Sequence, residues 1–127
     1  MLQMYGAKAT ILIRFESDMK SLASKLSTGF SIHEFRIEPR EDAPHDLVGS
    51  NEALGFEMWL EEKIDPSGQF RFSLTLSSQD TFLETAQGRM HDLSIWFAKI
   101  TSLLCRIDCL VPGTSAIFQN GKEGIPN

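Results

Sequence analysis

The sequence has only two cysteines among its 127 residues, and its basic residues are in the minority. Two cysteines cannot build the disulfide framework that holds small secreted scaffolds together. The 12 lysines and arginines face 17 aspartates and glutamates, a formal charge of −5. Binding to a phosphate backbone needs a basic surplus, so we expect no nucleic-acid partner.

Long apolar runs are also missing. No stretch approaches the roughly 18 apolar residues that cross a bilayer. The apolar run near the start is broken by Lys8 and Arg14, and no small-residue cleavage site follows it. We therefore expect a cytoplasmic protein with no targeting segment and no membrane partner.

Familiar catalytic, metal and phosphate motifs do not occur. There is no G-x-S-x-G, no P-loop, no G-x-G-x-x-G, no H-E-x-x-H and no C-x-x-C. His33, His45 and His91 each precede an acidic residue, but neighbouring residues on a strand point to opposite faces. We expect no enzyme, no metal and no cofactor; a small enzyme using His33 or His45 is an alternative.

The two cysteines, Cys105 and Cys109, lie in a segment, CRIDCLV, that alternates like a strand. On a strand they would be about 13 Å apart, whereas bridged cysteines have Cα atoms within about 7 Å. We predict two small buried side chains that do not pair with each other, with a redox or metal role as the alternative.

Length and composition fit one domain, since 42% of the residues are apolar and 23% are charged. We place this domain at residues 1–113. Residues 114–127 form a partly ordered tail, which Ile117 and Phe118 would pin.

The clearest period-two pattern near the start runs from Lys8 to Phe15 and predicts a strand with one buried face. A helix follows, capped by Ser17 or Asp18 and ended by Gly29. Its apolar stripe has the spacing i, i+3, i+4, i+7: Met19, Leu22, Ala23 and Leu26.

A second strand is predicted from Phe30 to Glu38. Its apolar positions change phase, which indicates either a bulge near His33 and Glu34 or a strand buried on both faces at one end. The polar connection from Pro39 to Leu54 is long for a compact domain, so it is either functional or mobile.

Two further strands form the strongest unit. Phe56–Glu61 and Phe70–Leu76 both alternate, and the segment IDPSGQ lies between them. Pro66 suits the second position of a turn and Gly68 suits a left-handed position, so this unit is a hairpin.

The last third of the sequence predicts a helical region that begins at Asp80 and is interrupted at Gly88. Its main helix runs from about Met90 to Leu104. A final strand from Cys105 to Val111 ends at Pro112 and Gly113. The resulting order is β-α-β-β-β-α-β. It predicts an α+β two-layer sandwich, a ferredoxin-like variant with both helices on one sheet face.

The other sheet face would be open. The alternation places Trp59 on it, together with the following residues: Thr10, Leu12, Arg14, Glu57, Glu61, Arg71, Ser73, Thr75, Arg106, Asp108 and Leu110. Aromatic and arginine side chains anchor protein interfaces. The alternative is that Trp59 packs on neighbouring stems or is covered by the long connection or the tail.

Acidic charge is concentrated in one segment. Residues 34–65 hold ten acids and three basic residues, a formal charge of −7. Such a field attracts a basic partner, although it also serves as a solvated surface. The candidate partner-binding residues are Glu38, Glu41, Asp42, Asp46, Glu57, Trp59, Glu61 and Arg71.

These features favour a non-enzymatic protein-binding module. Its most concrete form is an inhibitor or immunity-type protein that neutralises a basic partner such as a nuclease toxin. The alternatives are a small-molecule-sensing regulatory domain and a self-assembling structural subunit. A homodimer through the open sheet face is a further possibility.

Overall fold

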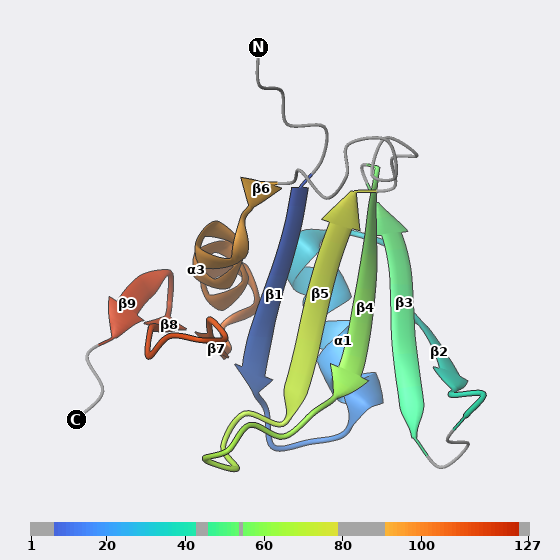
Figure 1. Ribbon diagram of the computed structural model, residues 1–127. Helices are drawn as coiled ribbons and strands as arrows, with labels where there is room; N and C mark the ends of the chain where they lie inside the picture. Colours follow the sequence, from blue (N-terminus) through green and yellow to red (C-terminus); the bar gives the residue numbers. More distant parts are fainter. Residues whose placement is uncertain (1–6, 43–45, 54, 79–90, 125–127) are drawn as a thin grey trace.

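The computed structural model describes residues 7–42, 46–53, 55–78 and 91–124 (Figure 1). This part of the chain is α+β, with two helices and nine strands. The helices are α1 (Met19–Phe30) and α3 (Ser94–Cys105). The strands are β1 (Ala7–Arg14), β2 (Arg36–Pro39), β3 (Leu47–Ala53), β4 (Phe56–Glu62), β5 (Phe72–Ser78), β6 (His91–Asp92), β7 (Asp108–Leu110), β8 (Ile117–Gln119) and β9 (Lys122–Gly124).

The strands form one open sheet in the order β2-β3-β4-β5-β1-β7-β8-β9, and each neighbouring pair is antiparallel. The short strand β6 pairs parallel to the start of β1. In Figure 1, α1 lies behind β1, β5 and β4, while α3 lies beside β1 and β7. No described helix covers the side of β3, β4 and β5 that faces the viewer.

The first strand and helix confirm the sequence prediction. Ala9, Ile11 and Ile13 of β1 are buried, as the alternation requires. The Asp18 side chain caps α1 by accepting a hydrogen bond of 2.8 Å from the Ser21 N–H. Hydrogen bonds from Ser21 hold the pKa of Asp18 below its ordinary value. The whole predicted stripe is buried: Met19, Leu22, Ala23 and Leu26.

The predicted end of this helix at Gly29 is wrong. The helix continues to Phe30, and Ser31 ends it in the left-handed region with φ 58°. Gly29 serves packing instead, because a Cβ placed there would lie 2.5 Å from the Cys105 Sγ. The missing side chain lets α1 and α3 approach closely.

The left-handed C-cap residues give a stability prediction. Ser31 and Arg106, which follow α1 and α3, have φ values of 58° and 55°. This conformation strains an L-residue but not glycine. We expect Ser31→Gly and Arg106→Gly each to raise the free energy of unfolding by about 0.5–1 kcal/mol in urea denaturation. Ser24→Gly, on the exposed side of α1, is the control and should lower it by about the same amount.

The predicted strand from Phe30 to Glu38 is mostly wrong. Phe30 belongs to α1, residues 31–35 are not a strand, and β2 covers only Arg36–Pro39. The change of apolar phase therefore marks the passage from helix to strand. It does not mark a bulge near His33 and Glu34.

The long connection predicted from Pro39 to Leu54 is also wrong, since β3 lies within it; Leu54 itself is outside the described residues. Two buried residues of β3 are small or polar. Gly49 fits closely between Ile37 and Leu60, where a Cβ would meet side-chain carbons at 3.1 and 3.3 Å. Asn51 donates a hydrogen bond of 2.8 Å to the His33 carbonyl.

The predicted hairpin is confirmed. Strands β4 and β5 pair from Phe56↔Ser78 to Glu62↔Phe72. Gly68 has φ 76°, and its N–H donates to the Asp65 carbonyl at 2.9 Å. This is the geometry of a type I turn with Pro66 at its second position.

The last helix starts later than predicted. His91 and Asp92 form β6, and α3 begins at Ser94. Positions 79–90, which include the expected Asp80, Gly88 and Met90, lie outside the described residues. The strand expected from Cys105 is shorter, since Cys105 ends α3 and β7 starts at Asp108.

Both cysteines are buried and free, which confirms the prediction that they do not pair. Burial raises the pKa of the Cys105 thiol to about 12 and also raises that of Cys109. Alkylation needs the thiolate. We therefore expect iodoacetamide at pH 8 to leave both thiols unmodified in the folded protein and to modify both in urea, as read by mass spectrometry. Rapid modification without urea would contradict the described burial.

After β7 the chain adds a hairpin, β8–β9, to the edge of the sheet. Phe118 is buried in the core. The Gly121 N–H donates a hydrogen bond of 2.9 Å to the Ser102 hydroxyl of α3.

Candidate protein-binding face

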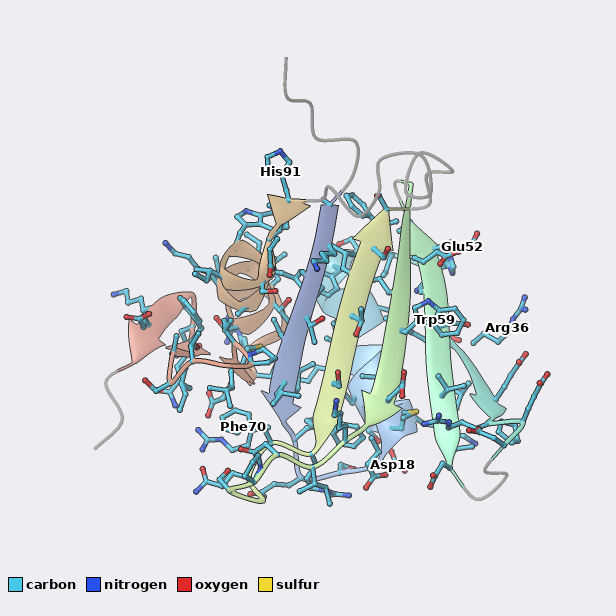
Figure 2. All side chains as sticks on the ribbon, viewed as in Figure 1. Asp18, Arg36, Glu52, Trp59, Phe70 and His91 are labelled. Atoms are coloured by element: carbon cyan, nitrogen blue, oxygen red, sulfur yellow. The ribbon has the colours of Figure 1, made fainter. Side chains whose placement is uncertain are left out.

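Strand β4 carries the most exposed aromatic side chain of the sheet. Its Met58 and Leu60 point into the core, so Glu57, Trp59 and Glu61 point to the opposite side. Trp59 is 41% exposed. Figure 2 shows it with Glu52 and Arg36 on the open side of β4, β3 and β2.

The cross-strand neighbours of Trp59 are short and leave 41% of the residue exposed. It lies directly opposite Ser50 of β3 and Thr75 of β5, both short hydroxyl side chains. We call this surface the Trp59 face. It consists of Val48, Ser50 and Glu52 from β3, Glu57, Trp59 and Glu61 from β4, and Thr75 and Ser77 from β5.

Two carboxylates of the Trp59 face oppose each other. Glu52 and Glu57 are directly paired across β3 and β4. Directly opposite residues have Cβ atoms about 5 Å apart, and like charges there destabilise a sheet. Within the described residues, neither carboxylate forms an ion pair.

Some of the other acidic residues in the segment 34–65 are paired with arginines. Arg40 lies 3.3 Å from the Glu61 carboxylate and 3.4 Å from that of Asp42. Arg36 lies 3.8 Å from Glu38. These pairs are exposed, so each contributes little to stability and its members remain available to a partner.

Seven of the eight predicted partner-binding residues divide into three groups. Glu57, Trp59 and Glu61 lie together on β4. Glu38 lies on β2 directly opposite Val48 of β3. Val48 in turn lies directly opposite Glu61 of β4. The remaining acids are exposed around the β2–β3 connection: Glu41, Asp42 and Asp46.

Arg71 lies apart from Trp59, close to the β4–β5 turn. Its guanidinium is 3.2 Å from the Glu62 carboxylate and 5.5 Å from the centre of the Phe72 ring. Arg106, expected on the open face, is instead the C-cap of α3. Glu52 was not among the predicted binding residues, because its strand was read as a loop.

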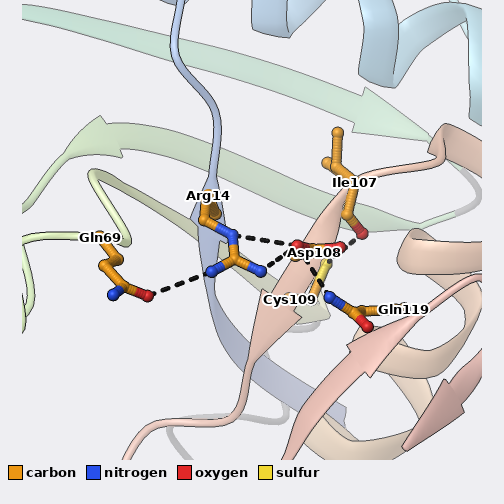
Figure 3. Close-up of polar contacts among 6 residues, drawn as sticks. All are labelled: Arg14, Gln69, Ile107, Asp108, Cys109 and Gln119. Carbon is orange, nitrogen blue, oxygen red and sulfur yellow. Dashed lines mark hydrogen bonds and ion pairs between the residues drawn. The ribbon is translucent and has the colours of Figure 1, made fainter. Parts of the chain in front are cut away.

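Arg14 and Asp108, also expected on the open face, are paired with each other on adjacent strands (Figure 3). The Arg14 Nε donates to Asp108 at 3.0 Å, and another guanidinium nitrogen donates to Gln69 at 3.1 Å. Gln119 donates to the same carboxylate at 3.1 Å. The guanidinium also lies 5.2 Å from the Phe70 ring centre. This network joins β1, β7, β8 and the β4–β5 turn, which indicates a structural role.

A polar recess of about 370 Å³ lies beside the Trp59 face, lined by His33, Glu34, Arg36, Ser50, Asn51 and Glu52. The His33 ring nitrogens contact the carbonyl oxygens of Glu34 and Glu52 at 3.2 and 3.0 Å. The ring therefore meets backbone, and it forms no ion pair with a carboxylate of the described residues. It fastens the α1–β2 connection to β3.

Among the residues that the structure describes, no cluster of three or more His, Cys, Asp or Glu side chains is placed to hold a metal. No described helix is long and apolar enough to cross a membrane. No known family model, curated protein or solved structure matches the chain.

Proposed function

We propose that the Trp59 face binds a basic protein and that the chain acts as an inhibitor or immunity-type protein. The observation that carries this proposal is the opposed pair Glu52 and Glu57 next to the exposed Trp59. The fold gains nothing from two carboxylates facing each other. A partner's lysine or arginine placed between them would relieve the repulsion.

The proposed mechanism is occlusion. A nuclease toxin must hold phosphate groups with cationic side chains in its cleft. The carboxylates of the Trp59 face would occupy those cations in place of phosphate. The indole of Trp59 offers a flat apolar surface on which a guanidinium or an aliphatic stem packs. The acidic field around β2–β4 would speed the encounter.

The test is capture of partners by the tagged full chain from lysate of its source cells, at about 50 and about 300 mM salt. We expect one basic protein to be retained at low salt and weakened at high salt, and its own activity to fall when the chain binds. Retention that does not change with salt, or a partner that is not basic, would refute the acidic-surface mechanism.

We also propose a cytoplasmic site of action, which the two free thiols support. We further propose a ferredoxin-like plan for β1, α1, β4, β5, α3 and β7, with both helices on one sheet face. The neighbour order β4-β5-β1-β7 and the close contact of Gly29 with Cys105 support it.

The remaining alternatives fit the described surfaces less well. An apolar recess of about 260 Å³ lies between the helices and the sheet, and the described residues that line it include no charged, hydroxyl or amide side chain to orient a small ligand. Self-assembly through the Trp59 face would bring Glu52, Glu57 and Glu61 against their own copies, which like-charge repulsion opposes.

A further inference from the structure

Arginine is the cation that this fold sets against its own carboxylates. All five ion pairs between described residues have arginine as their basic member. The Arg14 guanidinium lies 5.2 Å from the Phe70 ring centre while its Nε donates to Asp108 at 3.0 Å. Arg71 likewise lies 5.5 Å from the Phe72 ring centre and forms an ion pair. Twice in this molecule, therefore, an aromatic ring and a carboxylate together hold a guanidinium.

The Trp59 face holds the same two components but no arginine between them. Glu57 lies two residues from Trp59 on the same side of β4, about 7 Å along the strand. Glu52 lies diagonally across on β3, within the roughly 7–8 Å that aromatic and long side chains reach. Within the described residues neither carboxylate has an ion-pair partner, and no guanidinium lies over the Trp59 ring.

The free acceptors lie at one end of the indole. Glu61 is two residues from Trp59 in the other direction along β4, and its carboxylate is 3.3 Å from Arg40. A guanidinium that lies flat on the ring is therefore directed toward the end that holds Glu52 and Glu57. Its edge then faces both carboxylates, because they are directly paired across the two strands.

Arg36 shares this side of the sheet but does not cover the ring. It lies opposite Ser50, which lies opposite Trp59, so two strand spacings of about 10 Å in total separate it from Trp59. Its side chain is 77% exposed and is paired with Glu38 at 3.8 Å. In Figure 2 the Arg36 side chain lies beyond the Trp59 ring, toward the edge strand β2. The indole thus keeps a free surface for a cation from another molecule.

We infer, building on the proposed function, that the partner side chain that docks on Trp59 is an arginine and not a lysine. A guanidinium is planar and weakly hydrated, so its face lies on the indole while its edge donates to Glu52 and Glu57 at the same time. A lysine ammonium is a compact and strongly hydrated charge without a planar edge, so it cannot make both contacts in this way. The site therefore selects by shape as well as by charge.

The experiment titrates the wild-type chain with N-acetylarginine amide or N-acetyllysine amide, each of which carries one positive charge. The concentration reaches about 100 mM at constant ionic strength. The readout is the NMR signal of the Trp59 indole N–H, identified by its loss in Trp59→Phe, and the Trp96 indole is the internal reference. We expect the arginine amide to shift the Trp59 signal with a dissociation constant at least about fivefold lower than that of the lysine amide. Equal affinities, or no shift with either amide, would overturn the inference.

Neutral variants test the two carboxylates. Glu52→Gln and Glu57→Gln each remove one acceptor charge, and Glu123→Gln on β9 makes the same change far from Trp59 along the sheet. We expect each of the first two to weaken binding of the arginine amide at least about threefold, and the third to leave it unchanged, all with wild-type circular dichroism. Equal binding by all three variants would overturn the assignment of Glu52 and Glu57 as the acceptors.

The titration involves no partner protein, so its outcome is separate from that of the capture experiment. Salt-sensitive capture of a basic protein combined with equal affinity for the two amides would overturn the preference for arginine and leave the proposed function in place. Selective binding of the arginine amide without capture of any basic protein would support the preference for arginine and count against the proposed function.

Discussion

Adding a single methyl group at Gly29 is expected to lower the free energy of unfolding by about 2 kcal/mol. In an isolated helix the same Gly→Ala change would stabilise by about 1 kcal/mol. The opposite sign follows from packing, because the new Cβ would lie 2.5 Å from the Cys105 Sγ and 3.0 Å from the Leu104 carbonyl oxygen. Both atoms belong to α3, so relief requires the two helices to separate. Urea denaturation of wild type and variant measures the effect.

A double-mutant cycle isolates the cause. Cys105→Ala removes the sulfur, so in that background Gly29→Ala should lose most of its destabilising effect. A coupling of at least about 1 kcal/mol is expected between the two positions. If Gly29→Ala destabilises equally with and without the sulfur, the contact with the Cys105 sulfur is not the cause of the destabilisation.

Reversing the charge of Glu57 is expected to weaken partner binding about 100-fold while making the protein more stable. Lysine at this position would face Glu52 across β3 and β4, which replaces a like-charge pair with an ion pair. The change in stability is about 0.5–1 kcal/mol. The loss of affinity arises because a partner cation then meets a lysine beside Trp59. Urea denaturation and a titration of the captured partner give the two quantities.

The control is Glu123→Lys on β9, an exposed strand at the far end of the sheet from β4. It makes the same change in net charge, so it should leave affinity within about twofold and should not stabilise the protein. If both variants weaken binding equally, net charge decides the affinity and the Trp59 face does not.

The sequence predicted those elements whose buried side is apolar. The alternation of β1 and of the β4–β5 hairpin, and the stripe of α1, correspond to core positions. Strand β3 was not predicted, because the residues that it buries are Gly49 and Asn51. Gly49 is buried because Ile37 and Leu60 lie close to it, and the buried Asn51 donates a hydrogen bond to the His33 carbonyl. Neither residue adds an apolar side chain to a period-two pattern.

Two general sequence rules do not hold on the helices, because each pattern has more than one physical cause. Glycine near a helix end usually supplies the left-handed cap, but Gly29 makes room for Cys105 while Ser31 takes the cap. Apolar periodicity usually marks the core, but on α3 much of it lies outside. Both cases depend on which helix packs against which, and that is a tertiary property.

The candidate site could be predicted only in part, because the rest of it depends on which strands pair with which. Glu57, Trp59 and Glu61 follow from the alternation of one strand. Glu52 could not be placed beside them without β3, and the pairing of Arg14 with Asp108 needed the register of β1 with β7. Arg71 continues the alternation of β5, but it lies at the β4–β5 turn and forms an ion pair with Glu62.

The most direct test of the Trp59 face is partner capture by three immobilised proteins under the same conditions, quantified by mass spectrometry. These are the wild type, the double variant Glu57→Lys/Trp59→Ala, and the control Glu123→Lys. We expect a basic protein to be retained by the wild type and the control and to be lost from the double variant. Equal retention of that protein on all three would show that binding does not involve the Trp59 face.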